Sequence, residues 1–299
     1  MAARQAQPGD SIPVLEVGGT HVSAAWVDPD GWLVSEVSRF QLRADADADE
    51  LLAELASAAA GLGAPSGASW GVAMPGPFDY LGGIAHYRGV GKFEGLAGVD
   101  VGSALYDLLP DRPGAIRFVN DASAFLIGEW LIGAAVGATR CAALTLGTGI
   151  GSAFLDRGTV VDAGQSVPPE AEVHLLDRDG LPLEDWVSRR ALRRAYAQLA
   201  DTSEDCDVKE IADRARAGDA TAVQVFERAF TILGEVVGPW LERFGVDQLV
   251  VGGSISGAWD LIAGPLRTGL CRYSDCRYAI DRGAQLEFAP LVGAGYVAS

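Results

Sequence analysis

The start of the chain alternates between short apolar segments and turn residues. Residues 13–17 are apolar, residues 21–27 are apolar and small, and residues 32–42 alternate between apolar and polar side chains. Gly18-Gly19 separates the first two segments, and residues 28–31 (DPDG) separate the second from the third. Glycine, proline and aspartate are the residues that tight turns favour. The pattern therefore predicts three strands joined as a meander.

The following part of the chain mixes helical and extended patterns. Acidic residues 45–50 precede leucines at 51, 52 and 55, which predicts a helix with carboxylates at its positive end. Residues 82–98 are rich in glycine and have little periodicity, which indicates an ordered loop region. The other predicted elements of this half are a strand at 70–74, a short helix near 101–109, a strand at 116–119 and a helix at 122–134.

An internal repeat connects the two halves of the chain. Residues 15–28 (LEVGGTHVSAAWVD) resemble residues 144–156 (LTLGTGIGSAFLD), with the same strand, glycine turn, Ser-Ala pair and closing aspartate. Such self-similarity predicts two related halves. After the second hairpin, the pattern predicts helices at 183–199, 208–217, 220–244 and 257–270, strands at 248–251 and near 285–288, and a small-residue helix from 291. Alternating strands and helices are typical of the α/β class.

Composition narrows the classes of partner. The 299 residues include 40 acidic and 23 basic side chains, which gives a net charge of −17. This acidic excess argues against a nucleic-acid partner, because binding to the phosphate backbone needs a basic face. The longest apolar stretch, residues 125–138, contains Glu129 and is shorter than the roughly 20 residues of a membrane-spanning helix, so we expect no membrane segment.

The N-terminal residues and the cysteines indicate the compartment. Residues 1–10 lack the apolar segment of a secretory signal, so we expect a cytoplasmic protein. The four cysteines are scattered and none forms a C-x-x-C pair. This spacing favours reduced, mostly buried thiols over a disulfide framework or a metal site.

Two glycine turns are candidates for phosphate binding. Residues 147–151 (GTGIG) suggest a dinucleotide-binding fingerprint, but that motif opens a helix, whereas strand-like residues 152–155 follow here. A hairpin turn fits better, and its backbone N–H groups and hydroxyls can hold a polyphosphate without a lysine. The alternative for each turn is an ordinary hairpin glycine. Repetition of the turn at 18–20 and 147–149 weakens that alternative.

Asn120 and Asp121 lie where an apolar strand ends and a helix begins. One interpretation is that one of them is only the helix N-cap. The other is a carboxylate at the carboxyl end of a strand, where α/β sheets bind ligands, placed to accept a proton from an alcohol. A further polar cluster comprises residues 170–174 (EAEVH) and Glu184, which by themselves indicate solvated loop positions.

In combination, these motifs resemble those of the sugar kinases of the ROK (repressor, open reading frame, kinase) family. The resemblance covers residues 14–298 and rests on five motifs in order: EVGGT at 16–20, MPGP at 74–77, VNDA at 119–122, LGTGIG at 146–151 and VVGGSIS at 250–256. It implies an α/β, two-domain actin-like ATPase fold of the hexokinase and ribonuclease H-like type. Duplicated β-meander halves and a catalytic cleft between the domains belong to that expectation.

The resemblance also implies an activity and roles for individual residues. The activity is glucokinase-like transfer of a phosphoryl group from ATP to a sugar hydroxyl, with Asp121 as general base and with ATP and Mg²⁺ as cofactors. The sugar hydroxyls would be bound by Gly76, Asn120, Asp121, Glu172, His174 and Glu184. ATP would be bound by Gly18, Gly19, Thr20, Gly147, Thr148, Gly149, Gly252, Gly253 and Ser254. Turn glycines are the alternative interpretation of Gly252 and Gly253.

Two departures from the family pattern concern metal ions. The first phosphate motif begins with Glu16 instead of the usual aspartate, so the carboxylate expected to hold Mg²⁺ through water is one methylene longer. The family's zinc-binding insertion needs three cysteines, but the segment from His174 to Glu184 contains none. We therefore expect no structural zinc.

A third departure concerns the substrate. Gly89 stands where glucose-phosphorylating relatives carry an asparagine that touches the sugar. Glucose is therefore not assured, and the substrate is expected among hexoses and related sugars or cyclitols. Lys92, His86 and Arg88 are candidate replacements, with a solvated cation as the alternative for each. Lys92 is taken as a substrate-binding residue.

Domain boundaries, partners and a competing function complete the expectations. The first domain is expected at 11–121, completed by a C-terminal helix at 290–299, and the second at 122–289. A small-molecule sugar and ATP are the expected partners, and a homodimer is expected because family members are commonly oligomers. The alternative function is a regulatory or non-catalytic sugar-binding protein of the same family. The repressors of the family carry an N-terminal helix-turn-helix, for which the residues before the first strand are too few.

Overall fold

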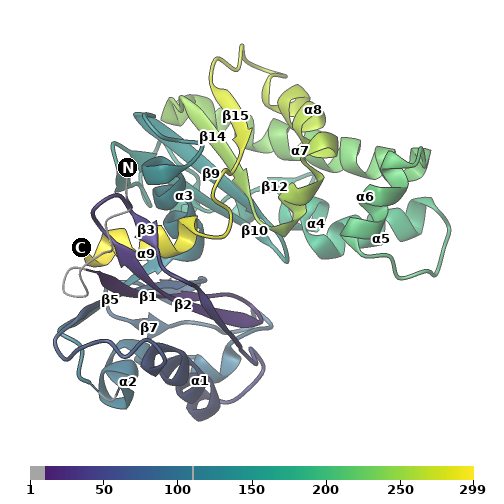
Figure 1. Ribbon diagram of the computed structural model, residues 1–299. Coiled ribbons are helices and arrows are strands. Elements are labelled where there is room, and N and C mark those ends of the chain that lie inside the picture. Colours follow the sequence, from purple (N-terminus) through teal and green to yellow (C-terminus); the bar gives the residue numbers. More distant parts are fainter. Residues whose placement is uncertain (1–10, 110) are drawn as a thin grey trace. The chain divides into compact units, whose positions relative to one another are not determined.

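A computed structural model describes residues 11–109 and 111–299 of the chain (Figure 1). The structure divides into two compact units: the described residues up to Ile132 together with Glu287–Ser299, and Gly133–Leu286. The expected boundary after residue 121 falls earlier, at the start of helix α3 (Asp121–Ile132). Helix α3 packs closely on α9 (Ala289–Ala298). The two backbones approach so closely at Gly128 that a Cβ there would lie only 2.1 Å from the Ala289 carbonyl oxygen. This contact groups α3 with the first unit.

The sheet of the first unit has the strand order β3-β2-β1-β5-β8, and β4 also pairs with β2. The strands are β1 (Ile12–Val17), β2 (His21–Asp28), β3 (Leu33–Val34), β4 (Ser38–Gln41), β5 (Ser69–Met74) and β8 (Ala115–Asn120). Strands β1 and β2 are antiparallel, whereas β5 and β8 run parallel to β1. The strand expected at 32–42 is interrupted after Val34, where the Ser35 hydroxyl accepts a hydrogen bond from the Trp26 backbone N–H.

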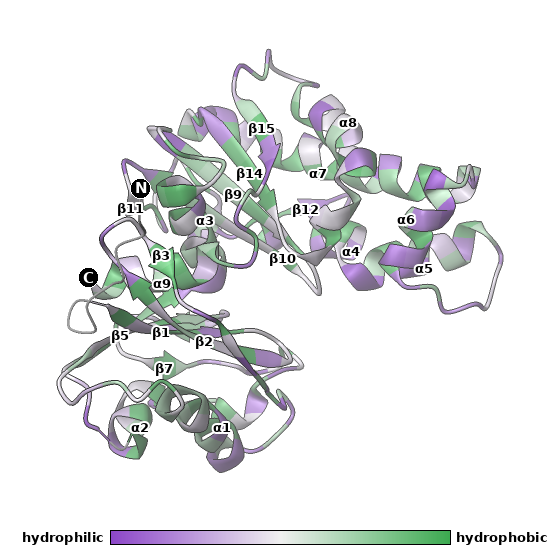
Figure 2. Cartoon of the chain, viewed as in Figure 1, coloured by the Kyte–Doolittle hydropathy of each residue, from purple (hydrophilic) through white to green (hydrophobic). Residues whose placement is uncertain are grey.

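Helices cover both faces of this sheet, with α1 (Ala48–Ala60) and α2 (Val101–Leu108) on one face and α9 on the other (Figure 1). Asp47 caps α1 by accepting a hydrogen bond from the Glu50 N–H, and the predicted leucines of α1 are buried. Helix α9 is apolar almost all round (Figure 2), because it lies against both the sheet and α3. Strand β6 (Phe78–Asp79) precedes the glycine-rich loop region, which contains β7 (Ile84–Ala85) and a 3₁₀ turn, η1 (Glu94–Leu96).

The sheet of the second unit repeats the topology of the first. Its order is β11-β10-β9-β14-β15, with strands β9 (Arg140–Leu146), β10 (Ile150–Asp156), β11 (Thr159–Val160), β14 (Gln248–Gly252) and β15 (Ala279–Arg282). Strands β9 and β10 form an antiparallel hairpin, and β14 and β15 run parallel to β9. The same hairpin-plus-parallel arrangement holds β1, β2, β5 and β8, as the sequence repeat predicts.

Helices and short hairpins complete the second unit. The helices are α4 (Glu184–Val187), α5 (Arg189–Leu199), α6 (Val208–Arg216), α7 (Ala220–Phe244) and α8 (Trp259–Leu270). The remaining elements are β12 (Asp177–Arg178), β13 (Leu181–Pro182) and the 3₁₀ turns η2 (Pro169–Ala171), η3 (Val173–Leu175) and η4 (Ser254–Ala258). The helix expected at 183–199 is broken at Ser188, whose side chain accepts the Ala191 N–H and begins α5 as its N-cap.

One predicted strand is wrong. Residues 285–288 alternate between polar and apolar side chains, but they form a turn that leads into α9. The actual strand is β15, which is short and pairs only with β14 at the edge of the sheet. Only Ile280 of β15 is buried, so the strand leaves no alternating pattern in the sequence. In the described part of the chain, no helix is long and apolar enough to cross a membrane.

Candidate active site

The first glycine turn joins β1 and β2 and is open to solvent. The Gly18 N–H donates to the His21 carbonyl oxygen at 2.8 Å, which closes the hairpin. Gly19 and Thr20 are exposed, and no atom lies within 4 Å of the position that a Cβ on Gly19 would take. The Thr20 hydroxyl hydrogen-bonds the His21 ring Nδ1 at 2.8 Å. The predicted phosphate turn is therefore accessible from solvent.

Glu16 lies near the end of β1, directly before this turn. Its Oε2 accepts a hydrogen bond of 2.9 Å from the hydroxyl of Ser23 on β2. Burial raises the pKa of Glu16, the Ser23 hydrogen bond lowers it, and the negative charge of Asp121 raises it. Within the first unit, the structure thus brings Glu16 and Asp121 into one electrostatic environment. Ser23 belongs to the Ser-Ala pair of the sequence repeat, which is the one signal that could have identified it.

From the sequence, either Asn120 or Asp121 could be the N-cap of α3, and the structure shows that Asn120 caps it. Its Oδ1 accepts the N–H groups of Ala122 at 3.0 Å and Ser123 at 3.1 Å. Its Nδ2 donates to the Tyr80 hydroxyl at 2.9 Å, and that hydroxyl donates to the Met74 carbonyl oxygen at 3.3 Å. Sequence reasoning missed Tyr80, because nothing in its surroundings distinguishes it from other aromatic residues. Asn120 therefore occupies the cap and holds the turn that carries Asp121 in a fixed orientation.

Asp121 begins α3 as a half-buried carboxylate. Its Oδ1 accepts the Ala122 N–H at 2.9 Å. Burial raises the pKa of Asp121, and the positive charge of Lys92 and the Ala122 hydrogen bond lower it. A carboxylate whose pKa is shifted upward by its surroundings is suited to accept a proton near neutral pH.

Lys92 is held near Asp121 by an anchored loop. The Glu94 carboxylate accepts the Gly91 N–H at 2.9 Å, and backbone hydrogen bonds of this kind lower the pKa of Glu94. Next to Lys92, the Phe93 ring is buried with its centroid 5.4 Å from that of the Tyr87 ring. The Tyr87 hydroxyl donates to the Pro75 carbonyl oxygen at 2.6 Å, directly before Gly76. The predicted residues Gly76 and Lys92 are therefore connected through a packed aromatic pair.

The second glycine turn joins β9 and β10 in the second unit. The Gly147 N–H donates to the Gly149 carbonyl oxygen at 3.0 Å, and Thr148 between them is exposed. The N–H of Arg189, the first residue of α5, donates to the Gly147 carbonyl oxygen at 2.9 Å. The positive end of α5 therefore lies beside the turn. This placement favours an anionic ligand at the second turn as well.

Glu184 and the residues 252–254 lie against the second turn. A Cβ on Gly149 would be 2.0 Å from Glu184 Oε1, and a Cβ on Gly147 would be 3.7 Å from the Ser254 hydroxyl. Gly253 has a φ of +80°, and its Cβ position is 2.3 Å from the Leu146 carbonyl oxygen. A close approach of backbone to backbone thus requires glycine at 253. Gly252 ends β14.

Glu172 lies between the turns η2 and η3, and His174 lies in η3. Glu172 Oε2 is 3.1 Å from His174 Nε2, and both side chains are half-buried. The buried Ser152 of β10 holds this segment, because its hydroxyl donates to the Ala171 carbonyl oxygen at 2.7 Å and accepts the Val173 N–H at 3.0 Å. Ser152 corresponds to Ser23 in the sequence repeat. In the first unit this serine donates to the Glu16 carboxylate itself, and in the second it bonds to the backbone on both sides of Glu172.

The predicted site residues form two groups, one on each unit. On the first unit they are Glu16, Gly18, Gly19, Thr20, Gly76, Lys92, Asn120 and Asp121, and on the second they are Gly147, Thr148, Gly149, Glu172, His174, Glu184, Gly252, Gly253 and Ser254. No group of three or more His, Cys, Asp or Glu side chains able to hold a metal ion occurs among residues 11–109 and 111–299.

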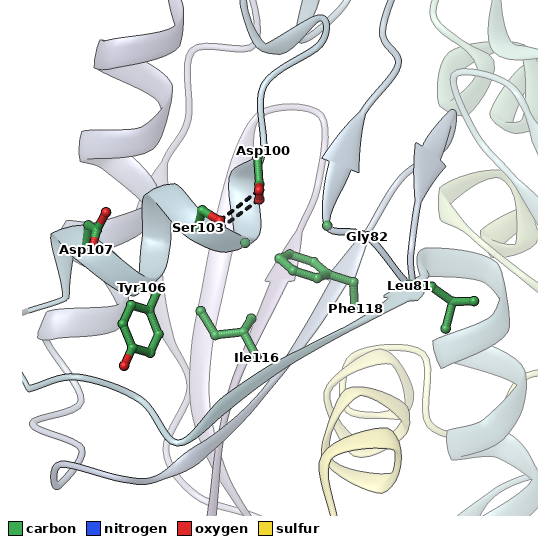
Figure 3. Close-up of a pocket in the computed structure, with 10 residues that line it drawn as sticks. Leu81, Gly82, Asp100, Ser103, Tyr106, Asp107, Ile116 and Phe118 are labelled. Carbon is green, nitrogen blue, oxygen red and sulfur yellow. Dashed lines mark hydrogen bonds between the residues drawn. The ribbon is translucent and has the colours of Figure 1, made fainter.

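A separate cavity of about 430 Å³ in the first unit contains none of these residues (Figure 3). Ile116 and Phe118 of β8 and residues of α2 line it. The Asp100 carboxylate on its wall accepts hydrogen bonds from the backbone N–H and the hydroxyl of Ser103 (Figure 3), so it serves as the N-cap of α2. The cavity is therefore distinct from the predicted site.

Curated relatives of this chain include sugar kinases. A glucokinase of Thermotoga maritima is 29% identical over 281 residues, which cover 87% of this chain and 86% of the relative. A beta-glucoside kinase of Klebsiella pneumoniae is 26% identical, and the match covers 82% of each chain.

Solved structures of similar proteins show the fold. A ROK hexokinase from Thermus thermophilus is 24% identical with a TM-score of 0.78, over 96% of this chain and 97% of that chain. A ROK family glucokinase from Streptomyces griseus, in complex with glucose and AMPPNP, is 22% identical with a TM-score of 0.79, over 96% and 99%. This likeness confirms the predicted actin-like ATPase fold. Since the family model for ROK matches residues 13–298, this chain belongs to the ROK family.

Proposed function

We propose that this protein is an ATP-dependent sugar kinase that transfers the γ-phosphoryl group of ATP to a hydroxyl of a hexose or a related sugar or cyclitol. The observation that carries the proposal is the pair Asn120 and Asp121. Asn120 accepts the Ser123 N–H and shares the Ala122 N–H with Asp121, so only Oδ1 of Asp121 is engaged, and Asp121 is a half-buried carboxylate with a raised pKa that directly follows a parallel strand. That is the environment in which a general base is expected.

In the proposed reaction the sugar hydroxyl oxygen attacks the γ-phosphorus and the bond to the bridging oxygen of ADP breaks. The hydroxyl proton passes to the Asp121 carboxylate. Transfer of this kind depends mainly on positioning and on neutralisation of the phosphate charge. The positive charge of Lys92 lowers the pKa of Asp121 and so favours the ionised carboxylate, which is the form that accepts a proton. The Lys92 ammonium would also donate a hydrogen bond to a hydroxyl of the substrate.

Sugar hydroxyls need both donors and acceptors. The Glu172 and Glu184 carboxylates supply acceptors, and His174 supplies a ring nitrogen. The Asn120 amide has its oxygen occupied by two backbone N–H groups, so its contribution is limited to donation. Gly76 would contribute backbone groups to the sugar, next to the Pro75 carbonyl oxygen that accepts the Tyr87 hydroxyl. The names of the two curated relatives, a glucokinase and a beta-glucoside kinase, support a glucose-like substrate class.

The proposed ATP site uses backbone groups. Neither glycine turn contains a lysine or arginine. The turns at 18–20 and 147–149 would hold phosphate oxygens through N–H groups and hydroxyls, helped by the positive end of α5. Residues 252–254, of which Ser254 lies near the Gly147 turn, would hold the adenosine part. The AMPPNP bound to the Streptomyces griseus glucokinase supports ATP as the donor.

The residues present fit a magnesium ion. Glu16 and Asp121 are hard oxygen donors in one environment, where the charge of Asp121 raises the pKa of Glu16. A divalent cation would relieve this repulsion, and Glu16 would hold it through water. When bound, the ion would neutralise charge on the phosphates.

An ADP-release assay with hexoses, amino sugars and cyclitols tests the proposal. We expect turnover with at least one of them and a loss of about 10²-fold or more in kcat for Asp121→Asn, with sugar binding kept. Asp45→Asn, at an exposed aspartate of the same unit, is the matched control and should keep full turnover. Unchanged turnover of Asp121→Asn would refute the role of the base, and sugar binding without turnover in the wild-type protein would favour the regulatory alternative.

A further inference from the structure

A buried carboxylate in the second unit has no role in the chemistry proposed above. Glu235 lies in the middle of α7 with only 4% of its side chain exposed. Arg178 Nη1 donates to Glu235 Oε2 at 2.5 Å, and Arg272 Nη1 donates to Glu235 Oε1. Burial of a charged group is costly, and a well-packed apolar residue is often as stabilising as a buried ion pair. Stability alone therefore does not explain Glu235.

The position of Glu235 is fixed by close packing of α7 against α8. A Cβ on Gly234 would lie 2.5 Å from the Leu266 carbonyl oxygen, and one on Gly269 would lie 2.1 Å from the Thr231 carbonyl oxygen. The two helices cannot shift relative to each other without breaking these contacts. Arg272 follows the end of α8 closely, so α7 and α8 together form a rigid support for the carboxylate.

Arg178 belongs to the hairpin that connects His174 to Glu184. Strands β12 and β13 pair through a tight turn in which Asp179 and Gly180 both have positive φ, and the Leu183 N–H donates to the Leu176 carbonyl oxygen at 2.8 Å. The Arg178 carbonyl oxygen accepts the indole N–H of Trp186 on α4 at 3.4 Å. Arg178 thus bonds to α7 through its guanidinium and to α4 through its backbone.

We propose that the Arg178–Glu235 ion pair positions the segment from His174 to Glu184 for sugar binding. The inference rests on the proposed function, in which His174 and Glu184 bind sugar hydroxyls. Among the described residues no cluster of metal ligands is available to hold this hairpin. The bond from Arg178 to Glu235 holds the hairpin instead of a metal ion. Arg178 is a positioning residue that does not touch the substrate.

The two arginines provide a matched pair of variants. Arg178→Met cuts the tether to the hairpin and leaves Glu235 paired with Arg272. Arg272→Met removes the same kind of bond from the same carboxylate and leaves the hairpin tethered. Neither variant leaves the buried carboxylate without a cation, so both should fold. We expect Arg178→Met to raise the KM for sugar about 10-fold or more, because misplaced binding groups lose affinity steeply.

The KM for ATP should stay within about twofold in both variants. The KM for sugar should also stay within about twofold in Arg272→Met, since Arg272 lies outside the hairpin and its loss leaves the bond between Arg178 and Glu235 in place. Arg178→Lys, which keeps the charge, should restore part of the sugar affinity. Equal sugar KM values in the two methionine variants would overturn the inference, and so would a rise in the KM for ATP that matches the rise for sugar.

Hydrogen exchange of the hairpin amides separates this inference from the proposed function. The Leu183 N–H and its neighbours at residues 176–183 should exchange faster in Arg178→Met than in the wild-type protein, and not in Arg272→Met. If the wild-type protein phosphorylates no sugar, the proposed function fails, while this measurement still decides whether Arg178 holds the segment. Equal exchange in the two variants would refute the tether.

Discussion

The contact between Gly149 and Glu184 makes a sharp prediction about how the second glycine turn and the sugar site depend on each other. In Gly149→Ala, the new Cβ would lie 2.0 Å from Glu184 Oε1, so the carboxylate must retreat to an ordinary separation of at least 3.4 Å. The obstacle is the free end of a side chain, and a rotamer adjustment costs only about 0.5–1.5 kcal/mol. The variant should therefore fold with nearly wild-type stability.

The effect on activity should be much larger than the effect on stability. If Glu184 binds the sugar, a displacement of this size should lower kcat/KM for sugar about 10²-fold, since an error of about 1 Å in a binding group can cost that much. The assay is steady-state ADP release with the sugar concentration varied at saturating ATP. Thermal unfolding of the same samples checks that the protein remains folded.

Two controls isolate the cause of the loss. Gly147→Ala changes the same turn, but its Cβ would make an ordinary 3.7 Å contact with the Ser254 hydroxyl, so the sugar KM should stay within about twofold. In a Glu184→Ala background, Gly149→Ala should cost little more, because its obstacle is gone. The reasoning is refuted if Gly149→Ala behaves like Gly147→Ala, or if its full effect persists without the Glu184 side chain.

Further predictions concern charge, packing and metal. Lys92→Met removes a cation that lowers the pKa of Asp121, so the acid limb of the kcat/KM profile should move to higher pH; an unmoved limb would contradict the interaction. Burial raises the pKa of Asp121 in the folded protein above 3.8, so ionisation of this carboxyl lowers the stability of the fold as pH rises. Asp121→Asn cannot ionise, and at about pH 7 it should unfold at the same temperature as wild type or higher. A lower unfolding temperature would refute this expectation. Gly253→Ala, with a φ of +80° and a Cβ 2.3 Å from the Leu146 carbonyl oxygen, should lose at least about 2 kcal/mol in denaturant unfolding, whereas a neutral change would show that the backbone can relax. Chelation of divalent metal should abolish most ATP binding in calorimetry, since neither turn carries a basic side chain, and retained affinity would mean that other groups neutralise the phosphates.

Much of the fold follows from local patterns in the sequence. The strands β1, β2 and β5 and the helix α7 lie where apolar periodicity and turn residues place them, because they are long enough to show a clear period. Strand β15 and the break at Ser188 were not predictable. A four-residue edge strand buries too little to leave a pattern, and a cap within a continuous helical sequence depends on how the two helices pack.

The candidate site shows the same division. Glycine turns and the Asn120-Asp121 pair are visible in the sequence, because phosphate turns and strand-to-helix junctions need particular residue types at adjacent positions. The roles within the pair are not visible. Only the hydrogen bonds of Asn120 to two backbone N–H groups and to Tyr80 show that Asn120 caps the helix, which makes Asp121 the candidate for the proposed general base.

By itself, the sequence determined the α/β class, the repeated meander and the motifs that identify the ROK family, because each is recorded in residues that are close together along the chain. Tertiary structure decided which distant residues act on one another. Ser152 bonds to Ala171, Glu184 lies close to Gly149, and Arg178 pairs with Glu235, which are contacts between residues 19, 35 and 57 positions apart. Such pairs depend on packing of whole elements, and no local pattern of residues encodes that.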